Sequence, residues 1–440
     1  MMRSLQVRYV TERAKHCLTI QHTRGQHLNI PTKKLVFLAV IALNLLLSGG
    51  RLAAEEYKAD AMIRTSETYN DNIYLTGRDR RFDYITEIVP AIGVTYKAPF
   101  WDWQGSYAYD YFYYSRADFH HDEISTANVT NLTRLYQDTL FVELNETHGR
   151  VSLDLQRDYT KQSTFVNQTD QNIFSVKPYT VFHPSARTTM RVGYIYENIW
   201  YKSKDAIGQR DNTAFGELGY QVSSQLTFTG TAQYTEDKNR ILSYNRGELI
   251  GGMRYEYLDG SILTGGIGNV WTYTSDGLSS TQLFWKAGFY HSFPKFKFSF
   301  ETSLSYPNDP TNSMLREDHY AVSIKREIER TSISATGSFD EFRDGQTKHL
   351  QSSSYTALGQ VTHKISAQST FLGDFTYQRL EDNVFNTYTE LYIWNLKYEY
   401  LAGKNVTMAV AYRYLNSYSP DLYQNNYYYN IYSVEIRKVF

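Results

Sequence analysis

Cysteine is almost absent from this chain of 440 residues, which has a single one, Cys17. We expect Cys17 to be removed with an N-terminal leader, so the mature chain has no disulfide and no cysteine for lipid attachment. No spaced zinc motif and no glycine-rich phosphate loop is present. The apolar run at 35–47 is too short to cross a bilayer as a helix.

The first 54 residues read as an export leader. Lys33 and Lys34 precede the apolar run 35–47, and Ala53 and Ala54 lie before Glu55. A positive flank, a short apolar stretch and small residues are typical of a secretory signal peptide. We therefore expect residues 1–54 to be leader and signal peptide, and 55–440 to be one domain. A membrane anchor at 35–47 is the rival interpretation.

The charge balance argues against nucleic acid as a partner. Of the 45 Lys and Arg and 46 Asp and Glu residues, eight basic residues and one acidic residue lie in 1–54, which leaves a net charge of −8. Nucleic-acid binding depends on cationic side chains that neutralise phosphates. An acidic exported domain is a poor candidate for that role.

Aromatic residues are abundant, with 40 Tyr and 23 Phe, while the mean hydropathy is −0.50. This combination is typical of a transmembrane β-barrel, because only alternate residues face lipid and aromatic girdles mark both interfaces. Strand-like segments have two distinct faces. One face of 226–234 and of 331–340 is apolar or aromatic, and the alternating residues are Thr, Ser, Gln or Asp.

Short and long connections alternate along the chain, as expected of periplasmic turns and extracellular loops. We predict an all-β, antiparallel, up-and-down transmembrane barrel of about 20 strands, with 18 as the alternative, in the outer membrane of a Gram-negative bacterium. Both termini are then periplasmic. The segment 139–160 is long for one strand, and Pro90 interrupts a ladder because it donates no hydrogen bond.

The last segment, 427–440, alternates and ends on an aromatic residue. A closing strand of this kind is where an assembly signal for the barrel-insertion machinery is expected. We assign that signal to Tyr432, Val434, Ile436 and Phe440.

Few residues suggest chemistry. The cluster 120–123, His-His-Asp-Glu, consists of metal-ligand residue types, but it falls in the predicted loop 116–123 and reads as solvated. His319 and the other histidines have no spaced partner. We therefore predict no catalytic residue, no metal and no cofactor. Charges predicted to face the lumen are of both signs, which argues against strong ion selectivity: Glu87, Asp110, Arg191, Glu197, Glu248, Arg254, Glu256, Lys286, Lys325, Asp374 and Lys397.

The start of the mature chain carries a specific motif, Glu67-x-Tyr69-Asn70-Asp71-Asn72-Ile73. It resembles the opening of the β-barrel porin 2 family, which includes outer-membrane proteins of exopolysaccharide and exosortase (PEP-CTERM) systems. The resemblance implies a passive pore without enzymatic activity. Because Asn, Asp and Asn favour turns, we expect these residues to shape the first loop.

The leading hypothesis is an outer-membrane porin that exports an exopolysaccharide or a capsular polysaccharide. The alternatives are a general or solute-specific diffusion porin, the barrel sheath of an electron-conduit complex, and an outer-membrane barrel hydrolase. Expected partners are outer-membrane lipid and the barrel-assembly machinery, together with polysaccharide-export components or a periplasmic cytochrome.

Overall fold

The computed structural model describes residues 56–136, 138–153, 160, 162–307, 309–311, 314–420 and 426–440. The proposed leader and signal peptide, 1–54, lie outside the described residues. Within them the structure is built from 20 β-strands and contains no α-helix. None of the described residues belongs to a helix of the length and hydropathy that crossing a bilayer would take.

The strands are β1 (Glu56–Asn70), β2 (Asp83–Ala98), β3 (Trp101–Tyr114), β4 (His121–Tyr136), β5 (Leu140–Ser152), β6 (Gln168–Ser185), β7 (Thr188–Tyr201), β8 (Gln209–Gln221), β9 (Leu226–Asn239), β10 (Tyr244–Leu258), β11 (Ser261–Thr274), β12 (Ser279–Ser292), β13 (Lys297–Ser305), β14 (Leu315–Ile328), β15 (Thr331–Asp344), β16 (Leu350–Lys364), β17 (Ser369–Asp382), β18 (Thr387–Gly403), β19 (Val406–Tyr418) and β20 (Tyr427–Val439).

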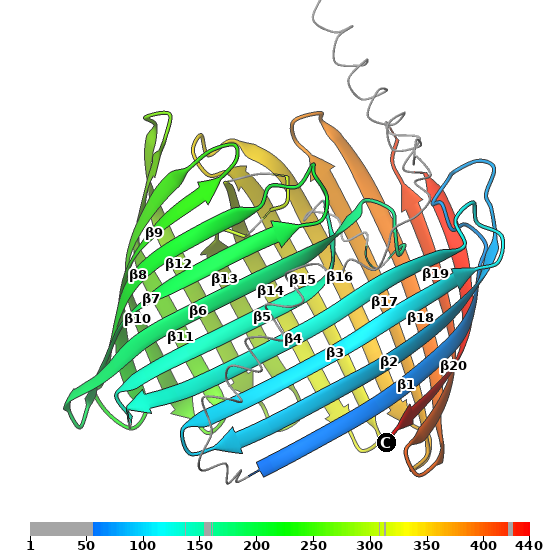
Figure 1. Ribbon diagram of the computed structural model, residues 1–440, viewed down its shortest axis with the longest axis horizontal. Helices are drawn as coiled ribbons and strands as arrows, with labels where there is room; N and C mark the ends of the chain where they lie inside the picture. The colour runs from blue at the N-terminus through cyan, green and yellow to red at the C-terminus, as the bar shows by residue number, and fades with distance from the viewer. Residues whose placement is uncertain are drawn as a thin grey trace, which may run out of the picture. The chain divides into compact units, whose positions relative to one another are not determined.

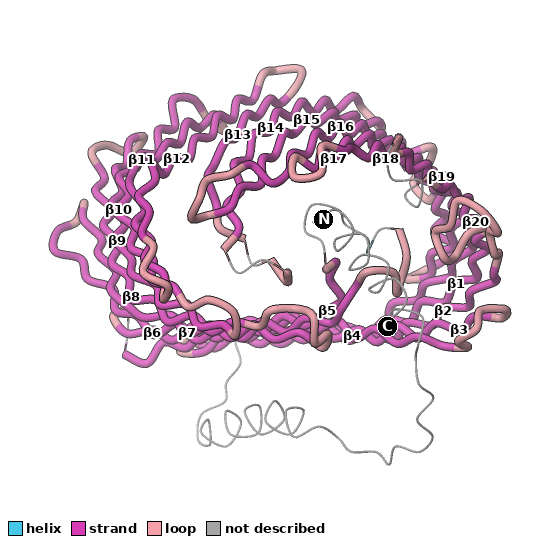
Figure 2. Tube along the Cα trace, turned by 90° about the horizontal axis from the view of Figure 1, so that it is seen from above, coloured by secondary structure: helices cyan, strands magenta, loops and turns pink. Residues whose placement is uncertain are grey.

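The strands form a closed antiparallel ring (Figures 1 and 2). Each strand pairs with its neighbours in sequence, and β1 pairs with β20 from Met62↔Val439 to Asn70↔Ile431. Closure satisfies the backbone groups that an open sheet would leave at its edges. The predicted up-and-down barrel is confirmed, with 20 strands rather than 18.

The two faces of the ring differ as the alternation predicts. The outward face carries large apolar side chains that are exposed, such as Leu249 (58 %), Ile267 (63 %) and Val434 (56 %). Tyr432 and Ile436 share this face with Val434, and the Phe440 backbone N–H donates to Ala61 O at 2.8 Å. Three of the proposed assembly-signal residues, Tyr432, Val434 and Ile436, therefore lie on the outer face of β20, and the exposed Phe440 follows the end of that strand.

Short and long connections alternate around the barrel. Turns of two to four residues follow every even-numbered strand up to β18, and connections of four to 15 residues follow the odd-numbered ones. Gly260 (φ 68°) and Asn405 (φ 68°) supply the left-handed conformation that two-residue turns need. The pairs Glu56↔Lys97 and Met62↔Val439 place both described chain ends at the short-turn end.

Two prolines interrupt the ladder, since proline has no N–H to donate. Pairing between β2 and β3 stops after Ile88↔Tyr111 and resumes at Ala91↔Ala108, which skips Pro90 as predicted. Pro178 interrupts the pairing of β6 with β7 in the same way. A Cβ on Gly193 would lie 2.6 Å from the Pro178 carbonyl oxygen, so only glycine fits there.

Two boundaries differ from the sequence expectation. The segment 139–160 is not one strand, because β5 ends at Ser152. The cluster at 120–123 is not all loop, since His121, Asp122 and Glu123 begin β4. In both places the end of the strand depends on which residues pair across the sheet. The alternation of residues within one segment does not reveal that pairing.

Candidate functional site: the lumen and its inward-folded hairpins

All eleven charged residues predicted to face the lumen lie on one face of the ring. The register links them through a continuous series of directly opposed residues, for example Arg191↔Glu217 and Ser334↔Lys325. Residues directly opposite each other in an antiparallel pair share a face. That face is the inner one, because segments that fold into the ring contact it (Figure 2).

Many charges on the inward face are paired with opposite ones. Arg64 donates two hydrogen bonds to Glu87 at 2.7 and 2.9 Å, and the Ser66 hydroxyl donates to the same carboxylate at 2.8 Å. Lys397 lies 2.8 Å from Glu399 and 3.8 Å from Glu435. Basic and acidic side chains therefore lie next to one another on the wall, and these residues do not form a ring of charges of one sign.

One part of the wall is mainly polar and uncharged, and it lies between Lys325 on β14 and Asp374 on β17. On β14 to β16 most inward positions at mid-strand are hydroxyl or amide side chains, with Ala321 and Leu358 among them. Some bond to one another: Thr336 to Ser323 at 3.0 Å and Ser334 to Gln360 at 3.3 Å. We call this surface the hydroxyl strip. Its members are Ser323, Ser334, Thr336, Ser338, Thr356 and Gln360.

The β5–β6 hairpin departs from the wall toward the long-loop end and enters the lumen (Figure 2). Pairing of β4 with β5 ends at Ala127↔His148, although β4 continues to His121 and β5 to Ser152. The upper part of β5 remains paired with β6 alone. The departure opens a seam between β4 and β5.

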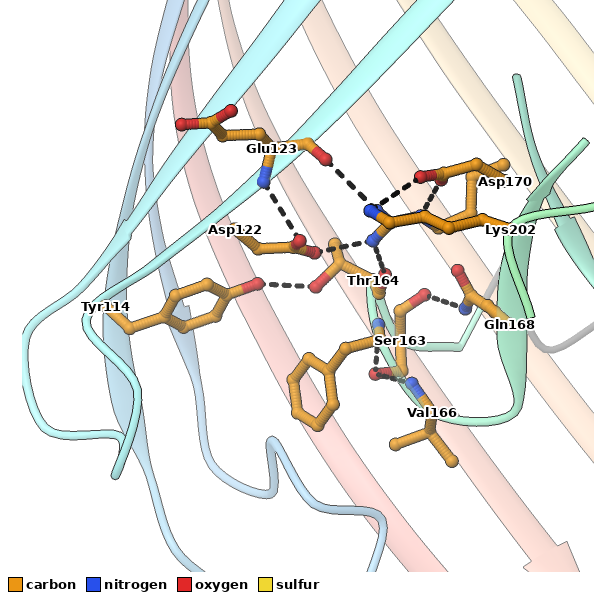
Figure 3. A network of polar contacts seen from close by, with 11 residues as sticks. Tyr114, Asp122, Glu123, Ser163, Thr164, Val166, Gln168, Asp170 and Lys202 are labelled. Atoms are coloured by element: carbon orange, nitrogen blue, oxygen red, sulfur yellow. Dashed lines mark hydrogen bonds and ion pairs between the residues drawn. The ribbon is translucent and has the colours of Figure 1, made fainter. Parts of the chain in front are cut away.

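Arg150 lies in this seam, and Figure 3 shows its partners Asp122, Glu123, Thr164 and Asp170. Its guanidinium donates to Asp122 Oδ2 at 2.7 Å, to Asp170 Oδ1 at 2.8 Å and to the Glu123 carbonyl at 3.0 Å. A further bond reaches the Thr164 carbonyl at 2.7 Å. The planar fork of arginine suits several acceptors at once. One side chain therefore ties β4, β5, β6 and the segment 162–167 together.

Apolar contacts hold the segment 162–167 against residues near β3 and β19. The Phe165 ring lies 4.8 Å from that of Phe119 and 6.2 Å from that of Tyr114, whose hydroxyl contacts Thr164. Val166 packs against a buried cluster that includes Leu415. The segment thereby links the walls on both sides of the β1–β20 closure. A cavity of about 160 Å³ lies beneath it, bordered by Thr68, Glu87, Phe112, Arg413 and Ile431.

A second hairpin, β13–β14, departs from the wall in the same way. Pairing of β12 with β13 ends at Lys286↔Ser303, although β12 extends back to Ser279. Arg316 fills this second seam. It donates to Asp318 at 2.8 and 2.9 Å and to the Gln282 amide oxygen at 2.6 Å. Among the described residues, two inward hairpins thus each have an arginine at the seam.

The motif at 67–73 lies at the closure of the barrel. Asp71 accepts hydrogen bonds from the backbone and side-chain nitrogens of Asn430 at 2.7 and 2.8 Å. Asn72 is fully buried and donates to the carbonyls of Thr76 and Tyr428 at 2.8 and 3.0 Å. The structure thus brings the loop after β1 into contact with β20, and the motif links the two strands that close the barrel.

The remaining motif residues divide between the two faces. Tyr69 lies on the outer face with its ring 6.3 Å from that of Tyr432, and Glu67 accepts a hydrogen bond from Thr86 at 2.7 Å on the same face. Asn70 accepts from the Asn72 N–H at 2.8 Å, and Ile73 is buried. The sequence located this motif, but only the fold reveals its partner, Asn430.

We expect Asn72→Ala to destabilise the barrel by about 2–3 kcal/mol, because it removes a fully buried amide and leaves the carbonyls of Thr76 and Tyr428 without their donor. The measurement is the temperature at which folded protein in detergent loses its faster gel mobility. Arg78→Ala, at an exposed position in the same loop, is the matched control and should change little. Equal melting of the two variants would contradict a structural role for Asn72.

Comparisons with known proteins show the fold and no more. No model of a known protein family matches the chain, and no curated protein matches it. A variant of the ferric enterobactin receptor (PfeA) of Pseudomonas aeruginosa, in complex with enterobactin, is 10 % identical with a TM-score of 0.51, over 87 % of this chain and 82 % of that one.

A second variant of that receptor gives 9 % identity and a TM-score of 0.50 over the same shares of the two chains. The FrpB iron transporter of Neisseria meningitidis, in its apoprotein form, gives 9 % identity and a TM-score of 0.47, over 87 % of this chain and 81 % of that one. At such low identity the likeness concerns the path of the chain alone, and this chain shares the fold of Gram-negative outer-membrane β-barrels.

Proposed function

We propose that this chain is an outer-membrane β-barrel that forms a water-filled pore, with both termini on the periplasmic side. The exposed apolar outer face is suited to lipid. Inward side chains such as Arg254 (51 % exposed) and Lys325 (48 %) are accessible to solvent inside the ring. Barrels of 16–18 strands already leave an aqueous channel, so 20 strands give ample width.

The hydroxyl strip supports a substrate rich in hydroxyl groups. Ser, Thr and Gln side chains donate and accept hydrogen bonds without holding a charged partner. A neutral or weakly charged glycan can exchange such bonds with successive positions of the strip while it moves. We therefore favour export of an exopolysaccharide or a capsular polysaccharide, by passive passage and without enzymatic activity.

The strip also suits a diffusion porin for smaller hydrophilic solutes, which is the second candidate. A barrel sheath for an electron-conduit complex would instead need a haem protein within the lumen. The two inward hairpins narrow the space that such a partner would occupy (Figure 2). For that reason the electron-conduit hypothesis ranks below both pore hypotheses.

In planar bilayers we expect ohmic channels with a K⁺/Cl⁻ permeability ratio near one, because the lumen charges are of both signs and many of them are paired. Neutral dextran on one side should reduce the current in a concentration-dependent way. Removing two hydroxyls, with Thr336→Val and Ser338→Ala, should weaken this block severalfold. Thr229→Val, on the inward face of β9, is the control. Equal block of all three proteins would contradict a glycan-binding strip.

Deletion of the gene tests the direction of transport. Loss of polysaccharide at the cell surface with accumulation in the periplasm would support an export pore. Unchanged surface polysaccharide, together with slower uptake of small sugars, would favour the diffusion porin. A purified barrel that conducts no current in bilayers would refute both pore hypotheses.

A further inference from the structure

Three side chains with metal-ligand chemistry converge on the inner wall, on neighbouring strands. Glu317 and His319 are two residues apart on β14 and therefore share a face, and Asp340 lies directly opposite His319 on β15. One ligand atom from each of the three lies within 4.8 Å of the other two. The sequence separates Asp340 from the other two by a whole hairpin, so spacing alone does not reveal the group.

Hydrogen bonds orient these side chains, one from a neighbouring strand and one within the group. The Ser305 hydroxyl donates to Glu317 Oε2 at 2.9 Å from β13. His319 Nδ1 and Asp340 Oδ1 are 2.5 Å apart, and the His319 side chain is one-third exposed. A hydrogen bond from a residue that does not itself bind the metal, like that of Ser305, orients a metal ligand. The exposed part of the imidazole leaves access from the lumen.

The charge of the group favours a cation. Two carboxylates and a neutral imidazole carry a charge of −2 at one place on the wall. The contact between His319 and Asp340 needs a proton between the two atoms, and a divalent ion coordinated by all three residues would replace that proton. One nitrogen and two carboxylate ligands suit Zn²⁺ and related divalent ions, with remaining positions filled by water.

We propose that Glu317, His319 and Asp340 bind a divalent transition-metal ion of the Zn²⁺ type on the lumen wall. The site goes beyond the proposed pore function and does not depend on it. Binding can be measured on purified protein in detergent, without transport, so a failure to conduct current leaves this test unaffected.

The test is calorimetric titration of Zn²⁺ into tag-free protein, first treated with a chelator, at pH 7.5. We expect one saturable ion per chain. Asp340→Asn, which preserves the shape of the side chain, and Glu317→Gln should each weaken binding by at least 10- to 100-fold, the range seen when only a supporting residue is lost. Binding should also weaken at pH 5.5, because protons compete for the imidazole.

Two controls separate this site from general binding by a histidine- and carboxylate-bearing surface. His363→Ala removes an outward histidine on β16, and Glu327→Gln removes an exposed carboxylate on the inward face of β14. Both should bind Zn²⁺ like the unaltered protein. X-ray absorption of the bound ion should show an N/O shell with one imidazole. No saturable binding, equal binding by Asp340→Asn, or a shell without imidazole would overturn the proposal.

Discussion

The Arg150→Ala substitution should lower the free energy of unfolding of the barrel by about 3–5 kcal/mol and raise the conductance of the pore. The guanidinium is almost buried between Asp122 and Asp170, and its loss leaves two largely buried carboxylates without their shared cation. It also removes the hydrogen bond that holds the Thr164 carbonyl. The segment 162–167 would then keep its apolar contacts and the hydroxyl contacts of Tyr114 and Tyr427 but lose its only arginine anchor among the described residues, and the lumen should widen.

The measurements are the heat-dependent gel shift for stability and single-channel recording for conductance. Arg150→Lys keeps the charge but not the fork, so its effect should be intermediate. Arg191→Ala serves as the control, since Arg191 is half-exposed and 3.8 Å from Glu217; exposed pairs contribute less than about 1 kcal/mol. A stable Arg150→Ala variant with unaltered current would show that the segment is held independently of the arginine.

The Arg316→Ala substitution, at the seam between β12 and β13, should lower the free energy of unfolding by about 3 kcal/mol. Asp318 is almost fully buried and loses a two-pronged partner, while Gln282 loses its donor. We expect a smaller effect than for Arg150, because the one carboxylate that Arg316 holds keeps a second cation, Arg343, 3.4 Å from Asp318. Of the two carboxylates that Arg150 holds, only Asp170 keeps one, Lys202 at 3.1 Å. The Arg316 guanidinium also lies over the Trp285 ring at 5.5 Å, a contact that the substitution removes.

Denaturant unfolding in lipid vesicles measures this loss, and the double variant provides the check. The two seams lie in different parts of the ring, between β4 and β5 and between β12 and β13. Distant sites that share no partner are usually additive. The effects of Arg150→Ala and Arg316→Ala should therefore sum. A double variant no less stable than Arg150→Ala alone would mean that the hairpins act as one unit.

The barrel itself could be read from the sequence because its information is local. Alternation in 331–340 assigned Ile333 to the outer face and Ser334 to the inner one, as the structure has them. Turn residues such as Gly260 marked the hairpins. Each strand pairs with the next in sequence, so correct strand boundaries suffice to give the topology.

The inward hairpins could not be predicted in this way. Leu140–Ser152 alternates like any other strand, and nothing in it indicates that its partner β4 is lost beyond Ala127. Arg150 resembles any polar residue until Asp122 and Asp170 are placed beside it. His319 was read as a histidine without a partner because Asp340 is 21 residues away. Such groups arise from cross-strand register, which a single sequence leaves open.

The closure by β1 and β20 sets the order in which the chain can fold. Every other strand pair joins neighbours through a connection of at most 15 residues, whereas Asp71 and Asn430 are 359 residues apart. Loop-closure entropy rises with chain separation, and contacts of long separation form slowly. Hairpins can therefore assemble one by one, but the ring closes late, and until then β1 and β20 present free edges through which unfinished chains can aggregate.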